Sequence, residues 1–490
     1  MGLIEKQTIK GTVYTYIGAA LGFINISLLF PKILLANQIG LLSILVAYSM
    51  LLSQFGNLGF TSATVRLFSY FRNKKKNHNG FLFLSICVSL VGFFITLIIF
   101  LVIKPSLIKN SVDNSQLLGN FIYYVIPLTF FTLFFNSLDV YYRALYNAII
   151  GVFLKEFLSR VLIFISVFLF FLNLIDFEQF VFCYILSLSL PTLIIIVSLI
   201  KEGNFNLRPQ LNFLTKDLTK SLASVSLFGI LGGFAGIIIV NIDRIMIERM
   251  LGLSSTGIYT IAFYFGTLII LPFRSLIKIS SAVIADAWKD NNKKIIYTIY
   301  YKSAINQLVI GIFIFIGIWA NIHNIFKILP APYESGRYVI FFISLAYLFD
   351  MSTGAAVSIV ANSKYYRYQT LFLLLLVVLV VISNFILIPK FGIVGAALAS
   401  ALSKFIYNLI RYLFIYFKFQ FQPYNIKFLY ILLIGAVSYF AGYIIPEFSN
   451  YVIDIFIRSI AISIIFISLI LILKISEEAN KKFKEIIRLF

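Results

Sequence analysis

The sequence has little charge and few of the residues from which soluble catalytic sites are built. Only 12% of its 490 residues are charged, whereas a soluble domain has about a quarter. Its two cysteines, Cys87 and Cys183, lie far apart in apolar runs, and its two histidines, His78 and His323, are isolated in polar loops. A soluble globular class, a disulfide framework and a CxxC metal site are therefore excluded. We expect no metal and no cofactor.

Nucleotide-binding signatures and extended polar domains are missing as well. There is no P-loop and no glycine-rich loop of the phosphate-cradling kind, so ATP bound to this chain is not expected to drive its activity. The longest polar segments, 61–80, 201–220 and 277–300, have only about twenty residues each. No long outer loop resembles the catalytic loop that a membrane glycosyltransferase or polymerase would need. We therefore predict that the protein is not an enzyme.

Apolar and aromatic residues dominate what is present. The chain is 61% hydrophobic, with 53 Phe and 29 Tyr, and its mean hydropathy is +0.98. A helix that crosses a bilayer needs roughly 20 mainly apolar residues. The predicted class is an all-α polytopic membrane protein with about fourteen transmembrane helices. The windows are 11–31, 40–60, 81–103, 117–138, 157–174, 178–200, 221–241, 256–276, 301–322, 338–360, 369–388, 391–413, 427–445 and 451–473.

The net charge of +21 follows from the arrangement of these spans. With fourteen spans, 31 of the 40 basic residues fall on the side of the N-terminus, eight fall on the opposite side, and Arg458 lies inside a span. Basic residues accumulate in cytoplasmic loops, which predicts that both termini are cytoplasmic. Because topology explains the charge, nucleic acid is not an expected partner.

The chain also carries an internal repeat. "GAALG" at Gly18 corresponds to "GGFAG" at Gly232, and the next span opens at Gly40 in the first copy and at Gly257 in the second. Repeats in transporters place the substrate path between the two halves. The predicted organisation is an N-terminal six-helix bundle (1–220), a C-terminal six-helix bundle (221–426), two additional spans (427–473) and a cytoplasmic amphipathic tail on the membrane surface (474–490).

Three segments carry a family resemblance. The first is "VANSKYYRYQTLFLLLLVVLVVISNFILIPKFGIVGAALASALS" (360–403), in which a basic loop leads to a span ending in Leu-Ile-Pro and a Gly-rich turn. The others are "NIDRIMIERMLGLSSTGIYTIAF" (241–263) and "YYRALYNAIIGVFLKEFLSRVLIF" (141–164). Together with the span count and the repeat, they resemble the oligosaccharide flippases of the multidrug/oligosaccharidyl-lipid/polysaccharide exporter superfamily.

The resemblance implies a fold of two bundles that face a cationic cavity, as in the multidrug exporters of the superfamily. It implies that a polyprenyl-diphosphate-linked oligosaccharide is moved by alternating access from the cytoplasmic to the outer leaflet of the bacterial cytoplasmic (inner) membrane. The product would serve O-antigen, capsule or exopolysaccharide synthesis. A polysaccharide polymerase and glycosyltransferases are the implied protein partners, beside the bilayer itself.

Basic residues near the ends of spans are the candidates for binding the substrate. Arginine pairs bidentately with phosphate and stays charged, and charges within spans are costly and usually functional. The alternative for each residue is an anchor that reaches to lipid head groups. The candidates for binding the diphosphate or sugar are Arg66, Arg274, Lys278, Arg143 and Lys32.

Three acids are the candidates for ion coupling or gating: Asp350, Asp243 and Asp139. Asp350 lies in the tenth window and has no evident partner near it in sequence. Asp243 lies where we expect the break between the seventh and eighth spans. Asp454 and Arg458 are four residues apart and are expected to pair with each other.

Two other cargoes remain open. A cation-coupled drug exporter of the same superfamily would need mid-span acids in the first six spans, which have none. A lipid II flippase would be expected to carry basic residues within spans 1, 2 and 8, but the second span has Gln54 and Asn57 instead. A surface polysaccharide repeat unit is the favoured cargo.

Overall fold

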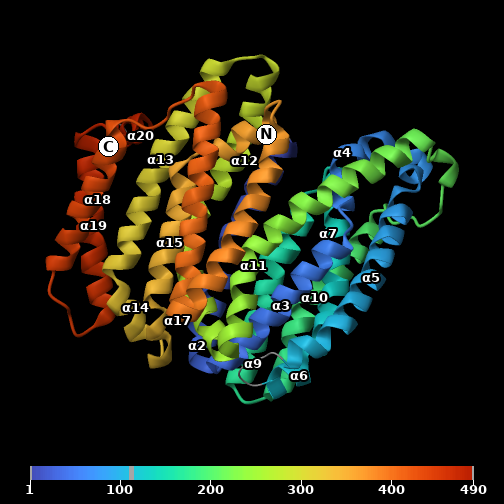
Figure 1. Ribbon diagram of the computed structural model, residues 1–490, viewed down its shortest axis with the longest axis horizontal. Coiled ribbons are helices and arrows are strands. Elements are labelled where there is room, and N and C mark those ends of the chain that lie inside the picture. The colour runs from blue at the N-terminus through green and yellow to red at the C-terminus, as the bar shows by residue number, and fades with distance from the viewer. Residues whose placement is uncertain (1–2, 110–114, 488–490) are drawn as a thin grey trace. The chain divides into compact units, whose positions relative to one another are not determined.

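The computed structural model describes residues 3–109 and 115–487, and every regular element in these ranges is helical (Figure 1). The chain divides into two compact units, Met1–Thr260 and Ile261–Phe490. The division falls inside one long helix and differs in place from the predicted bundle boundary at 220. The bundle limits given above remain a prediction.

The helices of the first unit pack against one another. Its core includes a group of aromatic side chains on α4, α5 and α7, with the ring of Phe81 against those of Phe68 and Phe71. The elements in chain order are α1 (Leu3–Phe23), the π-helix η1 (Ile24–Leu29), α2 (Phe30–Ile33), α3 (Ala36–Gly56), α4 (Phe60–Phe71), η2 (Lys74–Gly80), α5 (Phe81–Lys109), α6 (Ser115–Phe121), η3 (Ile122–Tyr124), α7 (Val125–Ala144), α8 (Ile149–Val152), the π-helix η4 (Phe153–Leu158), α9 (Ser159–Phe171), α10 (Phe177–Lys201), η5 (Leu211–Phe213) and α11 (Lys216–Gly266) as far as Thr260.

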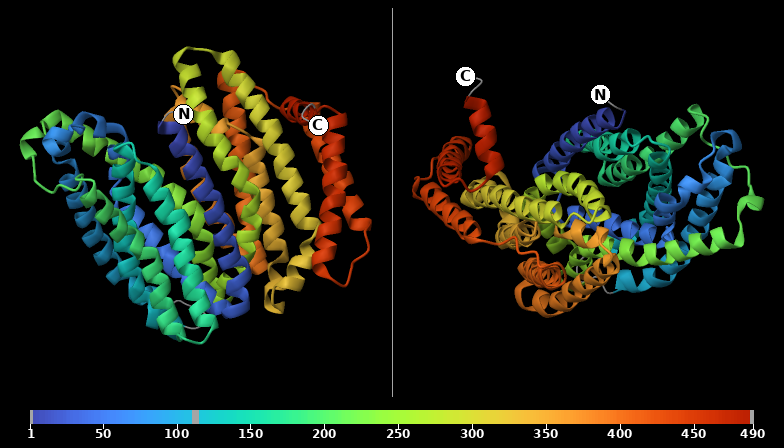
Figure 2. Two further views of the ribbon diagram at one scale, coloured as in Figure 1. Left: turned by 180° about the vertical axis from the view of Figure 1, so that it is seen from behind. Right: turned by 90° about the horizontal axis from the view of Figure 1, so that it is seen from above.

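The second unit contains the remaining helices. Figure 2 shows its last two long helices, α18 and α19, lying beside α13. A buried apolar cluster joins α13 to that pair, with Ile312, Ile434 and Phe466 among its members. The elements are the end of α11, η6 (Thr267–Ile270), α12 (Leu271–Lys289), α13 (Lys293–Ala320), α14 (Ile322–Ile328), η7 (Ala331–Gly336), α15 (Arg337–Ser352), α16 (Ala356–Asn362), α17 (Tyr366–Phe419), α18 (Ile426–Ile444), α19 (Tyr451–Ile472) and α20 (Glu477–Ile487).

The predicted fold class is confirmed: the protein is an all-helical, multi-pass membrane protein. Ten segments in the described residues are long and apolar enough to cross a membrane, or eleven when the bent pair α15–α16 is counted as one span. Two of the ten, Lys216–Phe273 and Tyr366–Phe419, have 58 and 54 residues, more than twice the length that a bilayer requires. Each therefore has the length of two of the predicted spans. The count of fourteen itself remains a prediction.

A single glycine divides each of these two segments. Gly252 has φ 85° and ψ 179° within α11, and Gly392 has φ 59° and ψ −138° within α17. Only glycine enters this part of conformational space without strain. The helix can therefore stop and restart at one residue, and each glycine forms the turn between two consecutive spans.

The predicted break at Asp243 was wrong in position. Helix α11 continues through Asp243 and Glu248 to Gly252, eleven residues beyond the expected end of the span at 241. The sequence "NIDRIMIERML" looked like a polar loop because of its charges. Its apolar residues Ile245, Met246 and Ile247 are nevertheless buried, so this extra length of helix packs inside the first unit.

The two glycines that the repeat marks as equivalent touch each other. Gly40 lies near the start of α3 and Gly257 lies just after the turn at Gly252. A Cβ atom on Gly40 would lie 2.0 Å from the carbonyl oxygen of Leu253, and one on Gly257 would lie 1.8 Å from that of Ala36. Backbone therefore packs directly on backbone here, which glycine permits between membrane helices.

The fifth predicted window, 157–174, falls on a composite helix. Helix α9 has only 13 residues, but η4 and α8 extend it back to Ile149. The π-helix η1 of the first span packs against α9, and the amide of Asn25 donates a hydrogen bond of 2.8 Å to the carbonyl oxygen of Arg160. Two π-helical turns, which are rare and often occur at functional sites, thus lie on neighbouring helices.

The C-terminal segment docks onto α13. Ile475 is buried in the apolar cluster of the second unit, and Lys302 of α13 pairs with Glu478 of α20 at 2.7 Å. Ser476 adds a hydrogen bond of 2.7 Å to Asn306. The tail therefore has a specific protein contact in addition to the membrane-surface position that the sequence predicts.

Candidate functional site

The predicted cationic residues come from four helices, α2, α4, α7 and α12. Arg66 is exposed on α4 and Lys32 is exposed on α2. Arg274 and Lys278 belong to α12, but their side chains lie outside the described residues. The role of these four residues in binding stays a proposal.

Arg143 and Asp139, both near the end of α7, form an ion pair of 2.9 Å one helical turn apart. Arg143 is half exposed, whereas Asp139 is mostly buried. Lys155 of η4 lies nearby and donates a hydrogen bond of 3.4 Å to Asn136. The pairing gives Asp139 a structural partner and leaves part of the Arg143 guanidinium open to solvent.

Asp243 is buried and is held across the turn at Gly252. The hydroxyl of Tyr259 donates a hydrogen bond of 2.7 Å to its carboxylate. Glu248, one helical turn further along α11, is completely buried, and Tyr48 of α3 is nearly so. The two acids of "NIDRIMIERM" are therefore buried inside the first unit, whereas Arg244 is partly buried and Arg249 is exposed.

Asp350 has two partners that sequence proximity could not reveal. Lys404 forms an ion pair with it at 2.8 Å, and the amide of Asn408 donates a hydrogen bond of 2.8 Å to its second oxygen. Both residues come from α17, more than fifty positions further along the chain. The expectation that Asp350 has no partner nearby in sequence holds, but the acid is paired across two helices.

Arg411 extends this network into the interior of the second unit. It is 1% exposed and donates hydrogen bonds to Thr353 at 2.8 Å and to Tyr407 at 2.9 Å, with a third to Asn408. The ammonium of Lys404 lies 3.5 Å from the centre of the Tyr347 ring. The network therefore contains one acid and two bases and has a surplus of positive charge.

Sequence reasoning missed Lys404 and Arg411 because it assigned both to cytoplasmic anchoring. Their spacing contained a usable signal: positions 404, 408 and 411 lie on one face of a helix. A polar stripe of that length on an apolar helix must face either a partner or a cavity.

A second buried ion pair lies within α19, and residues of α14 contact it. The predicted pairing of Asp454 with Arg458 is confirmed at 3.0 Å, and both side chains are buried. His323, which the sequence suggested was isolated, contacts Asp454 at 2.7 Å, and Asn324 also donates to this carboxylate. No group of three or more His, Cys, Asp and Glu residues suited to a metal occurs within the described ranges.

Comparison with known proteins places the chain in a family. The sequence model of the polysaccharide biosynthesis protein family matches residues 5–285, which is more than half of the chain. The chain belongs to the polysaccharide biosynthesis protein family. A family relative, the capsular polysaccharide biosynthesis protein CapF of Staphylococcus aureus, is 27% identical over 184 residues. That match spans 36% of this chain and 44% of CapF.

Solved structures define the fold of this family member. The lipid II flippase MurJ in an inward closed conformation matches with a TM-score of 0.75 at 16% identity, over 95% of this chain and 98% of MurJ. An inward-facing multidrug resistance transporter of the MATE family matches with a TM-score of 0.63 at 17% identity, over 82% of this chain and 93% of that one. The chain therefore shares the fold that the resemblance implied, the fold of MurJ and of the MATE transporters.

Proposed function

We propose that this protein flips a polyprenyl-diphosphate-linked oligosaccharide from the cytoplasmic to the outer leaflet for the synthesis of a cell-surface polysaccharide. The observation that carries the proposal is the family match over residues 5–285. The fold supports it, because the matched flippase structure covers 95% of the chain. Alternating access needs no bond to be broken, so the protein acts as a transporter and not as an enzyme.

The buried charges of the second unit suit an anionic cargo. A diphosphate in hydrocarbon requires compensating cations, and the network of Asp350, Lys404 and Arg411 has one more base than acids. In this proposal Asp350 positions Lys404 and Asn408, while Asp243 and Asp139 hold helices of the first unit. Arg66, Arg274, Lys278, Arg143 and Lys32 are proposed to attract the diphosphate and sugars near the ends of the spans.

The predicted location is the bacterial cytoplasmic membrane with both termini in the cytoplasm. Its support is the distribution of basic residues, 31 on one side and eight on the other. Single cysteines introduced into a chain that lacks Cys87 and Cys183 would test it. A reporter cysteine at Lys74 should resist a membrane-impermeant thiol reagent in intact cells, whereas one at Lys390 should react. The reverse pattern would refute the orientation.

Deletion of the gene tests the function directly. We expect a diphosphate-linked repeat unit to accumulate on the cytoplasmic side and the surface polymer to disappear. Unchanged surface glycan together with altered drug tolerance would instead identify a cation-coupled drug exporter. Impaired peptidoglycan synthesis with accumulation of lipid II would identify a lipid II flippase.

Two of the proposed cationic residues allow a finer test. The double variant Arg66→Ala with Arg274→Ala should export less polysaccharide at unchanged abundance in the membrane. Lys481→Ala with Lys482→Ala, which removes two charges from α20, is the matched control and should export normally. Full export by the first double variant would remove both residues from the substrate path.

A further inference from the structure

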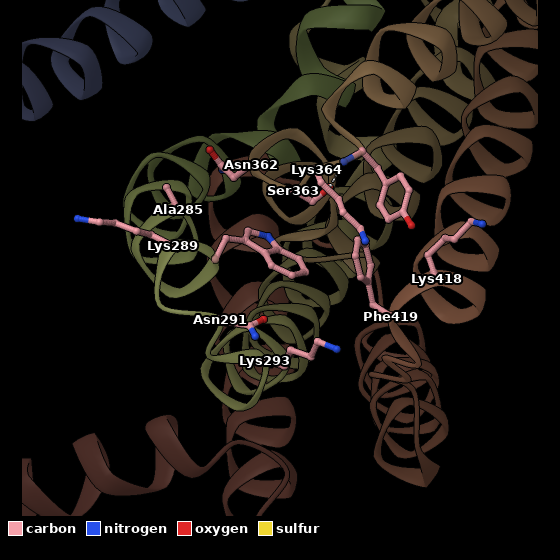
Figure 3. A pocket seen from close by; sticks show the side chains of 11 residues that line it. Ala285, Lys289, Asn291, Lys293, Asn362, Ser363, Lys364, Lys418 and Phe419 are labelled. Atoms are coloured by element: carbon pink, nitrogen blue, oxygen red, sulfur yellow. Dashed lines mark hydrogen bonds between the residues drawn. The ribbon is translucent and has the colours of Figure 1, made fainter.

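A lysine-lined pocket lies at one end of the second unit, apart from the buried network of Asp350. Four segments form it: the end of α12, the start of α13, the turn between α16 and α17, and the end of α17. Its volume is about 610 Å³, within the range of small-molecule sites. Figure 3 shows the side chains of these segments arranged around one hollow.

All charged residues that line this pocket are lysines. They are Lys289, Lys293, Lys364 and Lys418. All four are exposed, and none belongs to an ion pair in the described part of the chain. Topological anchors need only lie on the correct side of the membrane, yet these cations belong to four segments that are up to 129 positions apart and together form a single cavity. A positive field without a counter-charge favours an anion.

The lining also offers an aromatic surface. Trp288, Tyr365 and Phe419 form it, with the Trp288 and Phe419 rings 5.0 Å apart and the Tyr365 and Phe419 rings 5.8 Å apart. In Figure 3 the side chain of Lys364 extends toward Phe419, while that of Lys289 points away from the hollow. Lys364 and Lys418 lie 5.2 and 5.8 Å from the centre of the Tyr365 ring. Cations above apolar rings suit a ligand that combines a charged group with a less polar body.

The expected position of the pocket relative to the membrane indicates which class of anion it could bind. The four lysines belong to segments that the charge distribution predicts to be cytoplasmic, close to the ends of α12, α13 and α17. Phosphate is the anion that lipids present at this depth, and lysine binds it as a point charge. The pocket has polar partners for sugar hydroxyls as well, in Asn291 and Asn362.

We propose that this pocket binds the phosphate-bearing head group of the lipid-linked sugar on the cytoplasmic side, before the substrate is moved across the membrane. The inference rests on the proposed function for the identity of the lipid. Binding of a diphosphate by the pocket can nevertheless be measured without transport. A phosphate from an ordinary anionic phospholipid shares this chemistry, and the experiment separates the two sources.

The chain contains only two tryptophans, Trp288 and Trp319, so the pocket carries its own fluorescent reporter. Trp319→Phe leaves Trp288 as the single tryptophan, and Trp319 is not part of the pocket lining. The full-length variant is placed in nanodiscs of phosphatidylcholine and titrated with inorganic pyrophosphate at constant ionic strength. A saturable change in Trp288 emission is expected.

Lysine substitutions test where the pyrophosphate binds. Adding Lys364→Gln and Lys418→Gln should raise the apparent Kd by about tenfold or more, since each removes a charged contact. The matched control, Lys481→Gln with Lys482→Gln, removes two exposed charges from α20 and should leave the Kd unchanged. The proposal is overturned by a Trp288 signal that does not saturate, or by equal Kd values in both double variants.

The source of the phosphate is tested with nanodiscs that contain phosphatidylglycerol. An unchanged pyrophosphate titration supports the proposal. Loss of the pyrophosphate response, with the same emission change produced by the phospholipid alone, would identify a phospholipid site and overturn it. In cells, Lys364→Gln with Lys418→Gln should lower surface polysaccharide at equal protein abundance. Normal surface glycan after gene deletion would refute the proposed function, whereas the pyrophosphate titration is independent of that result.

Discussion

The Arg458 guanidinium donates a hydrogen bond of 3.0 Å to the Asp454 carboxylate one helical turn earlier, with both side chains almost fully buried in α19. Arg458 also donates to the carbonyl oxygens of Gly442 and Ile445, where α18 ends. The pair therefore fastens the end of one helix to the start of the next, and His323 ties α14 to the same carboxylate.

Removing only one member of this pair should strongly destabilise the folded protein. We expect Arg458→Met to cost about 3–5 kcal/mol, because it leaves a buried carboxylate without its counter-charge. Thermal unfolding of the purified protein measures the effect. Asp454→Asn with Arg458→Met removes both charges and should recover part of the loss. A double variant less stable than Arg458→Met would contradict this interpretation.

Asp350 and Lys404 should show energetic coupling in a double-mutant cycle. The variants are Asp350→Asn, Lys404→Met and the two combined. Residues in one ion-pair network couple by about 0.5–3 kcal/mol, and the 2.8 Å contact places this pair in that group. Thermal unfolding gives the stabilities, and export assays show whether the pair also serves transport. Strictly additive losses of stability would mean that the contact contributes nothing to the fold.

The contact between Gly40 and Gly257 makes both positions intolerant of a methyl group. Gly40→Ala should destabilise the first unit by about 1–3 kcal/mol or more, because the new atom meets the backbone of Leu253 at 2.0 Å, and overpacking of this kind forces the backbone to shift. Gly317→Ala in α13 is the matched control, since a Cβ there has nothing within 4 Å. Membrane abundance and melting temperature report both changes. Equal melting temperatures would show that the α3 contact is looser than described.

Lowering the pH should weaken the docking of α20 onto α13. Burial raises the pKa of Glu478, but hydrogen bonds from Lys302 and Asn306 outweigh it and hold this pKa below its ordinary value of 4.5. A carboxyl with a depressed pKa stabilises docking above its ordinary pKa, and this contribution is lost as the pH falls through the depressed value. Protease cleavage within α20 should therefore accelerate below about pH 4.5. Glu478→Gln should show fast cleavage already at pH 7, and slow cleavage in this variant would exclude the contact as the cause.

The sequence was sufficient for the fold class and the family, because a bilayer imposes length and apolarity on every crossing helix. It also identified the Asp454–Arg458 pair, whose members are one helical turn apart. Partners that come together only through packing could not be found in this way. Lys404 meets Asp350 because α15 and α17 are neighbours, and no local pattern encodes that distance.

Charge was the feature most easily misread. In "NIDRIMIERM" the four charges suggested a polar break, but a helix can bury a carboxylate that has a hydrogen-bond donor, as Asp243 has in Tyr259. The lysines that line the pocket were interpreted as determinants of topology alone. Topology explains on which side they lie, whereas the convergence of Lys364 and Lys418 on one pocket depends on the tertiary structure.

The turns at Gly252 and Gly392 bear on how this protein can be engineered. A hairpin that reverses at one residue has no loop into which a tag can be inserted. An epitope, a cleavage site or a fluorescent domain placed there would separate the two helices. The six-residue segment between α18 and α19, 445–450, is an alternative position for such a tag in the second unit. In this segment Glu447 forms an ion pair of 3.1 Å with Lys327 of α14, and both side chains are exposed. Exposed pairs of this kind contribute little to stability.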